Sequence, residues 1–333
     1  HAAVAAFVLG EDGGDVRAHE PDREIVTLAD YRQRHGQYKT DPDLQAAHAS
    51  APWIVTWDDH EVQNDYAGGA NAQADASAFL AQRTAAWQAF YENMPLRRSS
   101  IPSGPDMRIF RRLSWGRLAN FHMLDTRQYR DDQACDDGWD TNCEAALDPS
   151  RTITGAAQEQ WLREGLSRSG ARWDFLGQQV FFGGRRNAEG ARETVSMDSW
   201  DGYAGSRDRV TAAWQDAGVR NPVVLTGDVH KHWAADVKTD YADPDAPVVG
   251  TELVASSITS GGNGSDSSAD ALKWNPHIKF NNDLRGYLRV DLSAQLLEAR
   301  FRVVDYVSEL GSSVRTRAVF GVGDGEHRLH RIA

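Results

Sequence analysis

The sequence predicts an α/β fold of layered sheets and helices. Helix-like and strand-like segments alternate through the first two-thirds of the 333 residues, and strand-like segments dominate from residue 233 onward. This order is typical of a mixed sheet covered by helices. No shift in composition marks a domain boundary and no internal repeat is apparent, so we expect one domain over residues 1–333.

The first half of the chain is expected to contain three helices. Thr27 is a plausible N-cap for the first, and Asp41-Pro42 opens the second with proline at the first helical position. Residues 53–57 are short, apolar and rich in aromatic residues, as expected of a buried strand. The expected helices cover residues 27–38, 41–49 and 70–91, and the expected strands cover 2–9, 53–57, 107–113 and 117–124.

The second half is expected to contain two helices and a series of strands. Thr154 is a candidate cap for the first helix, and a Gly- and Ser-rich stretch at 260–268 predicts a surface loop. The expected helices cover residues 154–167 and 207–217, and the expected strands cover 173–182, 222–226, 233–238, 248–258, 286–292, 297–306 and 314–320.

The overall charge excludes several classes of function. A net charge of −12 at pH 7 argues against nucleic acid or an anionic membrane as a partner, because both require clustered positive charge. No apolar run approaches the roughly 18 residues of a membrane span. We expect a monomer that binds neither nucleic acid nor the membrane interior.

Two cysteines lie close together in a polar segment. Cys135 and Cys143 favour a local disulfide and an oxidising compartment, with two free thiols or half of a metal site as alternatives. The chain begins at His1 rather than Met, which indicates a fragment, a processed form or a truncated chain that would have lost any signal peptide.

Two apolar segments end in similar groups of acidic residues and histidine. The expected strand at 53–57 leads into Asp58-Asp59-His60-Glu61, and the strand at 222–226 leads into Gly227-Asp228-Val229-His230. Buried carboxylates are costly unless a cation compensates them. A lone pair of this kind is usually a capped strand end, but two together predict a shared metal site. Asp228 and His230 would point to the same side of a strand.

Arg127 follows another strand end. A guanidinium beside a metal centre suits bidentate phosphate binding, and the alternative is an ion pair with Asp125. Residues 60–64 superficially resemble a zinc-protease motif, but Asn64 stands where the second histidine is required. His232 and Lys231 would either reach the site or face solvent. The other candidates are expected to be structural: His19, His35, His48, His122, Asp201, His277 and Arg285.

The motif Trp57-Asp58-Asp59-His60-Glu61 with Asn64-Asp65-Tyr66 resembles the signature of the PhoD-like alkaline phosphatases, within the calcineurin-like metallophosphatases. The resemblance covers nearly the whole chain, with motifs in the same order. The further motifs lie at residues 124–130, 200–203, 226–230, 257–260, 275–277 and 285–287.

The resemblance implies a four-layer α/β/β/α sandwich with mixed sheets and a secreted, metal-dependent phosphoesterase. It implies iron and calcium as the metals and twin-arginine export. By position, Asp59, Asn64, Asp228 and His230 would bind metal, His60 would contact the phosphate, and Arg127 would clamp it. The substrate would be a small phosphate ester or a phospholipid, and a phospholipase D-type phosphodiesterase is an alternative.

The sequence departs from the family pattern at its start. The family carries an N-terminal β-rich domain, then a cysteine-containing strand, then a strand ending in Gly-Asp-Tyr that supplies a bridging ligand. Here Phe7-Val8-Leu9 is followed by Gly10-Glu11-Asp12, without that motif. We therefore expect an N-terminally truncated form, and a non-catalytic remnant of the family is a second alternative.

Overall fold

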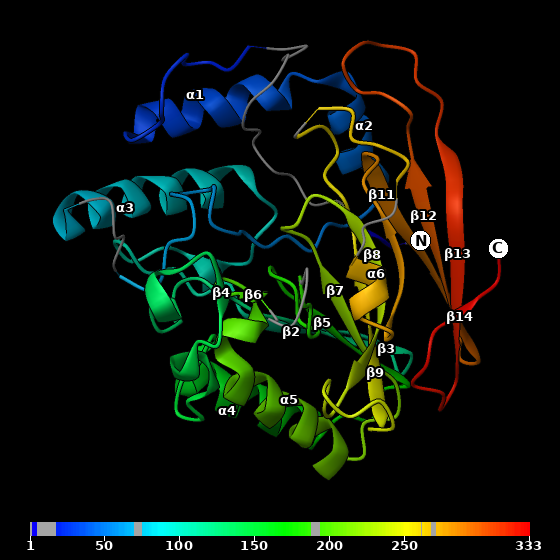
Figure 1. Ribbon diagram of the computed structural model, residues 1–333. Helices are drawn as coiled ribbons and strands as arrows, with labels where there is room; N and C mark the ends of the chain where they lie inside the picture. Colours follow the sequence, from blue (N-terminus) through cyan, green and yellow to red (C-terminus); the bar gives the residue numbers. More distant parts are fainter. Residues whose placement is uncertain (1, 5–17, 70–74, 188–193, 261, 268–270) are drawn as a thin grey trace.

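Two β-sheets packed face to face organise the chain in the computed structural model (Figure 1). The structure describes residues 2–4, 18–69, 75–187, 194–260, 262–267 and 271–333. The strand expected at 2–9 is present at Ala2–Val4, and its remainder, with the turn expected after it, lies outside the described residues.

The larger sheet is mixed. Its order is β10-β8-β9-β7-β5-β3-β2, and β3, β5, β7 and β9 run parallel, so their carboxyl ends meet at one edge. The strands are β2 (Arg111–Trp115), β3 (Ala119–Met123), β5 (Trp173–Gly177), β7 (Pro222–Thr226), β8 (His232–Lys238), β9 (Val248–Val254) and β10 (Ile278–Asn282).

The smaller sheet is antiparallel. Its order is β1-β11-β12-β13-β14, and its strands are β1 (Ala2–Val4), β11 (Gly286–Leu292), β12 (Leu296–Val303), β13 (Arg315–Gly323) and β14 (His330–Arg331). Alternate residues of β12 are buried, which places Phe301 against Phe175 and Val223 in the core between the sheets. The other face carries charged side chains such as Glu298 and Arg300.

Helices α4 (Gly155–Leu166) and α5 (Ala204–Asp216) cover the other face of the larger sheet. Leu162, Leu166 and Trp214 pack on Leu176 and Val224 of that sheet. Helix, sheet and sheet thus form successive layers, which confirms the predicted α/β sandwich. In the described ranges no helix covers the outward face of the smaller sheet, so the fourth expected layer is not observed there (Figure 1).

A separate helical group packs beside the sheets (Figure 1). It consists of α1 (Leu28–Lys39), α2 (Pro42–Ser50) and α3 (Ala76–Asn93). Thr27 and Asp41 cap the first two helices as predicted, and Asp75 caps the third at Ala76, later than expected. Trp87 of α3 stacks on Trp57 with ring centroids 3.7 Å apart. This stacking fixes the segment that precedes Asp58.

The prediction of a strand at 53–57 is wrong. None of these residues belongs to a strand of the described chain, and only Trp57 is buried. Side chains hold the segment instead: Arg111 donates to the Val55 carbonyl at 2.7 Å, and Gln179 Nε2 donates to Thr56 Oγ1 at 2.8 Å. An apolar run becomes a strand only where a neighbouring strand can take its backbone hydrogen bonds.

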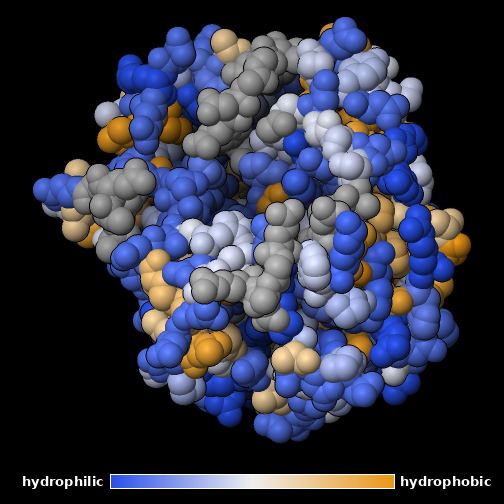
Figure 2. Space-filling view, in the orientation of Figure 1, coloured by the Kyte–Doolittle hydropathy of each residue, from blue (hydrophilic) through white to orange (hydrophobic). Residues whose placement is uncertain are grey.

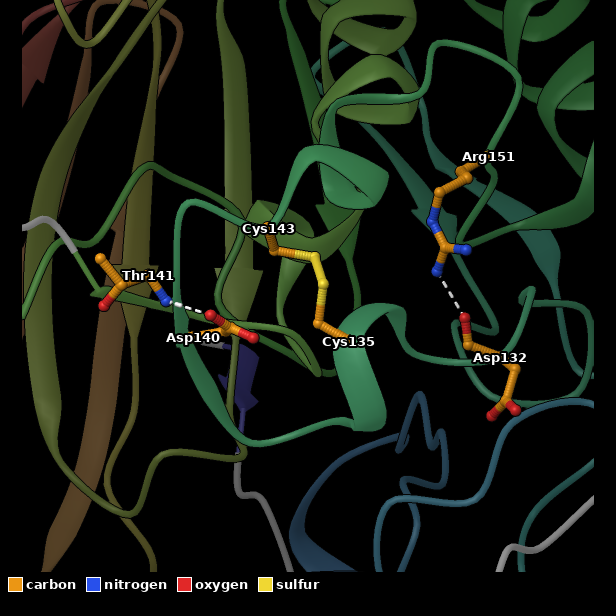
Figure 3. The surroundings of a disulfide bond; sticks show 6 residues. All are labelled: Asp132, Cys135, Asp140, Thr141, Cys143 and Arg151. Atoms are coloured by element: carbon orange, nitrogen blue, oxygen red, sulfur yellow. Dashed lines mark hydrogen bonds between the residues drawn. A yellow bond between two sulfur atoms is a disulfide. The ribbon is translucent and has the colours of Figure 1, made fainter.

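The cysteine loop forms the predicted disulfide, Cys135–Cys143 (Figure 3). Arg151 donates to the Asp132 carbonyl beside it. Two short strands of this region were not predicted, β4 (Trp139–Thr141) and β6 (Thr194–Ser196), and they pair antiparallel. The remaining short elements are α6 (Ala271–Trp274) and the 3-10 helices η1 (Arg98–Ser100), η2 (Ala134–Asp136), η3 (Glu144–Leu147) and η4 (Trp200–Tyr203).

The visible surface is mostly hydrophilic (Figure 2). In the part of the chain that the structure describes, no helix combines the length and apolar character needed to cross a bilayer.

Candidate active site

The carboxyl ends of the parallel strands bring the candidate residues to one edge of the larger sheet, the usual place for a site in such sheets. Gln179, after β5, connects three of the segments there. Its Oε1 accepts from Thr126 N at 3.1 Å, its Nε2 donates to Thr56, and its carbonyl accepts from Gly227 N at 3.1 Å. The segments that precede Asp58, Arg127 and Asp228 are therefore held side by side.

Arg127 lies at the centre of the site and is fully buried. Its Nε donates to Asp58 Oδ1 at 2.6 Å and its Nη1 donates to Asp198 Oδ1 at 2.6 Å. Its Nη2 lies 3.7 Å from both Asp59 Oδ2 and Asp228 Oδ1. The two acidic segments singled out from the sequence thus share one guanidinium nitrogen.

Asp125 places Arg127 through the backbone. Asp125 Oδ1 accepts from the backbone N–H groups of Arg127 and Gln128, each at 3.0 Å. The alternative of an Arg127–Asp125 ion pair is therefore wrong, because the Asp125 carboxylate binds amides of its own turn. The Arg127 guanidinium instead binds aspartates of other segments, Asp58 and Asp198.

Asp198 was missed by the sequence reasoning. Its Oδ1 accepts from Arg127, from Arg130 Nη1 at 2.5 Å and from Gln133 Nε2 at 2.9 Å. It lies just before Trp200-Asp201-Gly202-Tyr203, a motif that was noticed, but attention fell on Asp201. Asp201 pairs with Arg207 at 2.5 Å, so its structural interpretation is confirmed.

Asp59 is bound by its own loop. Its Oδ1 accepts from His60 N at 2.8 Å and its Oδ2 from Asp65 N at 2.9 Å. His60 Nε2 lies 4.0 Å from Asp59 Oδ2, so the imidazole borders the carboxylates. Asn64 is exposed, and its side-chain amide donates to Asp65 Oδ2 at 2.7 Å. The structure brings His60 directly to the site and Asn64 to its rim.

The second acidic segment is a turn rather than a continued strand. Strand β7 ends at Thr226, and Asp228 and His230 have positive φ angles of 63° and 49°. The argument that they share one side of a strand is therefore wrong, since the backbone has left the extended conformation. The His230 carbonyl accepts from Ser256 Oγ at 2.9 Å and from Arg285 Nη1 at 2.6 Å. Arg285, expected to be structural, positions this turn.

The other histidines and Lys231 are structural. His232 begins β8, is fully buried, and accepts from Ser256 N at 3.1 Å through Nδ1. His277 contacts the Gly184 carbonyl at 2.7 Å. Lys231 lies 3.6 Å from Asp283. His122 contacts Asp174 at 2.8 Å, away from the site.

Negative charge exceeds positive charge in this cluster. Burial raises the pKa of Asp58 to about 6 and of Asp65 and Glu61 to about 7, and it raises that of Asp228 well above its usual range, with Asp58 adding repulsion. Burial also opposes ionisation of Asp198, but Arg127 and Arg130 outweigh it and lower the pKa. A surplus of buried carboxylates favours an additional cation.

The donor set fits a hard metal ion in chemistry and charge, since carboxylate oxygens are the preferred ligands of such ions. The described residues do not, however, converge into a group of three or more His, Cys, Asp or Glu side chains around one point. The carboxylates are gathered around Arg127 instead.

The chain is a layered α/β protein with an acidic cluster at the carboxyl ends of its parallel strands. The profile of the PhoD-like phosphatases matches residues 3–301, and the chain belongs to this family. This confirms the resemblance inferred from the motifs.

Two similar proteins support the same family assignment. The chain is 49% identical over 324 residues to alkaline phosphatase D of Bacillus subtilis (strain 168), covering 96% of this chain and 55% of that protein. A solved structure of PhoD matches with a TM-score of 0.91 and 47% identity, covering 94% of this chain and 61% of the other. The chain thus spans a little over half the length of these relatives.

Proposed function

We propose that this protein is a metal-dependent phosphoesterase that hydrolyses phosphate mono- or diesters. The observation that carries the proposal is the position of Arg127 Nη2, which lies 3.7 Å from both Asp59 and Asp228. These aspartates come from two motifs of the PhoD-like family, whose profile covers residues 3–301.

Asp59, Asn64, Asp228 and His230 are the residues that would hold metal, with iron and calcium implied by the family resemblance. Bound metal would polarise a phosphoryl oxygen and lower the pKa of a bound water. The surplus of carboxylates supports this assignment, because the pKa values of Asp58, Asp65 and Asp228 are raised.

His60 and Arg127 would act on the phosphate. His60 borders the carboxylates and is partly exposed, so it is placed to bind a phosphoryl oxygen or protonate the leaving oxygen. Arg127 Nη2 is buried and has no hydrogen-bond partner in the described chain. This nitrogen is available to bind a phosphoryl oxygen.

The Cys135–Cys143 disulfide supports an oxidising location, and we propose that the protein is exported. A monomer acting on a small phosphate ester or on a phospholipid headgroup is sufficient for this function.

The test is hydrolysis of p-nitrophenyl phosphate, bis-p-nitrophenyl phosphate and phosphatidylcholine with added iron and calcium, together with elemental analysis. Asp228→Asn should lower kcat by about a hundredfold or more, the scale of losing one group that stabilises transition-state charge. The matched control is Asp208→Asn on the exposed side of α5, which should leave kcat unchanged.

Absence of hydrolysis of all three esters, with metal content measured, would overturn the proposal. A folded chain that binds no metal would instead support a non-catalytic member of the family. Hydrolysis of phosphatidylcholine in preference to the other two would favour the phospholipase D-type alternative.

A further inference from the structure

Arg185 is a half-buried cation that the proposed mechanism does not use. Its Nε is buried without a hydrogen-bond partner, and its guanidinium forms no ion pair with any described residue. By contrast, Arg127 and Arg130 both pair with Asp198. Arg185 is therefore a positive charge without an ion-pair partner among the described residues, and Asp228, Asp201 and Glu252 act on it only from a greater distance.

Three aromatic rings surround the Arg185 guanidinium. Its Cζ lies 4.9 Å from the ring centroid of Trp139, 4.9 Å from that of Phe181 and 5.5 Å from that of Trp233. Phe181 and Trp233 are buried, whereas Trp139 is 48% exposed. Cation–π contacts hold the guanidinium in place without consuming its N–H donors.

The rings come from the same segments that build the site. Phe181 lies two residues after Gln179, and Trp233 follows the turn that contains Asp228 and His230. Trp139 of β4 pairs with Ser196 of β6, and Ser196 lies two residues before Asp198. Burial lowers the pKa of Arg185. Among its charged neighbours, Asp228 does most to raise that pKa again.

A cation in this position has a clear use in an acidic site. The carboxylates around Arg127 repel an anionic substrate, and the positive charges of Arg127 and Arg130 are offset by Asp58 and Asp198. Arg185 retains donors for an anion, and the half-exposed Trp139 places it at the outer side of the cluster. With the phosphoryl group at Asp59 and Asp228, as proposed, this outer side would take the alcohol part of the ester.

We propose that Arg185, supported by Trp139, forms a subsite that binds a second anionic group carried on the alcohol part of the phosphate ester. The inference rests on the proposed function. It identifies the preferred substrates as esters whose alcohol bears a further carboxylate or phosphate, and it makes Arg185 a determinant of specificity.

The test is a binding comparison by calorimetry that does not require turnover. Benzylphosphonate and 4-carboxybenzylphosphonate differ by one carboxylate and are not hydrolysed. The wild-type protein should bind the carboxylated compound about tenfold more tightly, as expected for one added charge-assisted hydrogen bond. Arg185→Gln should remove that preference, and Arg185→Lys should retain part of it.

Arg168→Gln is the matched control, because it also removes one positive charge, but from an exposed ion pair with Glu164. It should leave the preference unchanged. Trp139→Ala should weaken the preference while leaving the melting temperature close to wild type, since this ring is half-exposed.

Equal affinity of the wild-type protein for the two phosphonates, or no binding of either, would overturn the subsite. An Arg185→Gln variant that weakens both ligands alike would also overturn it, because Arg185 would then act only through the fold. Failure to hydrolyse any ester while the carboxylate preference persists would reject the proposed activity and retain the subsite.

Discussion

The two acidic segments of the site look alike in sequence and are built differently. Asp228 follows β7, a central strand with parallel neighbours on both sides. Asp58 and Asp59 follow a segment outside any strand of the described chain, held by the side chains of Arg111 and Gln179. Backbone hydrogen bonds to neighbouring strands fix the segment before Asp228. Side chains from distant elements fix the segment before Asp58.

The difference shows what a short motif can and cannot specify. An apolar run followed by Asp and His predicted that the two segments share one site, and both reach Arg127, but only the second has a strand before its turn. The backbone hydrogen bonds of a strand need partners on neighbouring strands, and those strands can lie far away in sequence. The first segment should therefore be the more sensitive to changes elsewhere in the molecule.

The largest effect is expected from removing the arginine that joins the two segments. Arg127→Met would leave Asp58 without its buried partner and Asp198 with Arg130 alone, at a cost of about 3–5 kcal/mol. Urea denaturation should show this loss of unfolding free energy. Arg168→Met, at an exposed ion pair, is the control, and equal midpoints for the two variants would contradict the central role of Arg127.

Opening the disulfide should affect the first segment more than the second. Gln133 of the neighbouring loop donates to the Asp65 carbonyl at 2.6 Å and to Asp198 at 2.9 Å. Replacing Cys135 and Cys143 by alanine should cost about 2–3 kcal/mol, the scale for a short closed loop. Hydrogen exchange should accelerate at residues 59–65 and stay unchanged at 222–226. Equal acceleration in both segments would remove the distinction between them.

A matched pair of threonines compares the segments directly. Thr226 Oγ1 donates to Glu252 Oε1 and accepts from Gln178 Nε2, each at 2.7 Å, and the residue is buried. Thr226→Val should cost about 1–3 kcal/mol, because it leaves buried polar groups unsatisfied. Thr56→Val, at a half-buried position, should cost about 0.5–1.5 kcal/mol. The reverse order in urea denaturation would show that the Thr226 side chain is not the more strongly held of the two.

The smallest expected effect is a gradual dependence of the protein's stability on pH in metal-free buffer. The folded-state pKa values of Glu61 and Asp65 are raised to about 7, and that of Asp58 to about 6, mainly by burial. The folded chain then binds more protons than the unfolded chain between about pH 4 and 7, so stability falls as pH rises through this window.

With EDTA present, the melting temperature should be higher near pH 5.5 than near pH 8. Glu61→Gln should reduce the difference, and Glu164→Gln on α4 should not. A melting temperature that rises with pH in this range would show that positively charged groups of the protein already offset the negative charge of these carboxylates.

Features with local causes were predictable from the sequence. Thr27 and Asp41 satisfy helix N–H groups within their own first turns, and β7 was placed at residues 222–226 by its apolar composition. Asp59 and Asp228 were expected in one cluster because both follow apolar runs, and each lies 3.7 Å from Arg127 Nη2. Asp198 follows a three-residue strand that pairs with β4, more than fifty residues earlier in the chain, so no local pattern marked it. Strand β10 was missed because Asn281 and Asn282 are polar but become buried by pairing with β8.

The position of Arg127 has a consequence for the order of folding. It bonds to Asp58 and Asp198, which lie 69 residues before it and 71 residues after it. Contacts at such separations form slowly because the intervening chain must first be ordered, whereas the helices and their adjoining strands form from nearer neighbours. At neutral pH the guanidinium offsets the repulsion between the carboxylates that it brings together. A chain arrested before that step would have its secondary structure in place and no assembled acidic cluster.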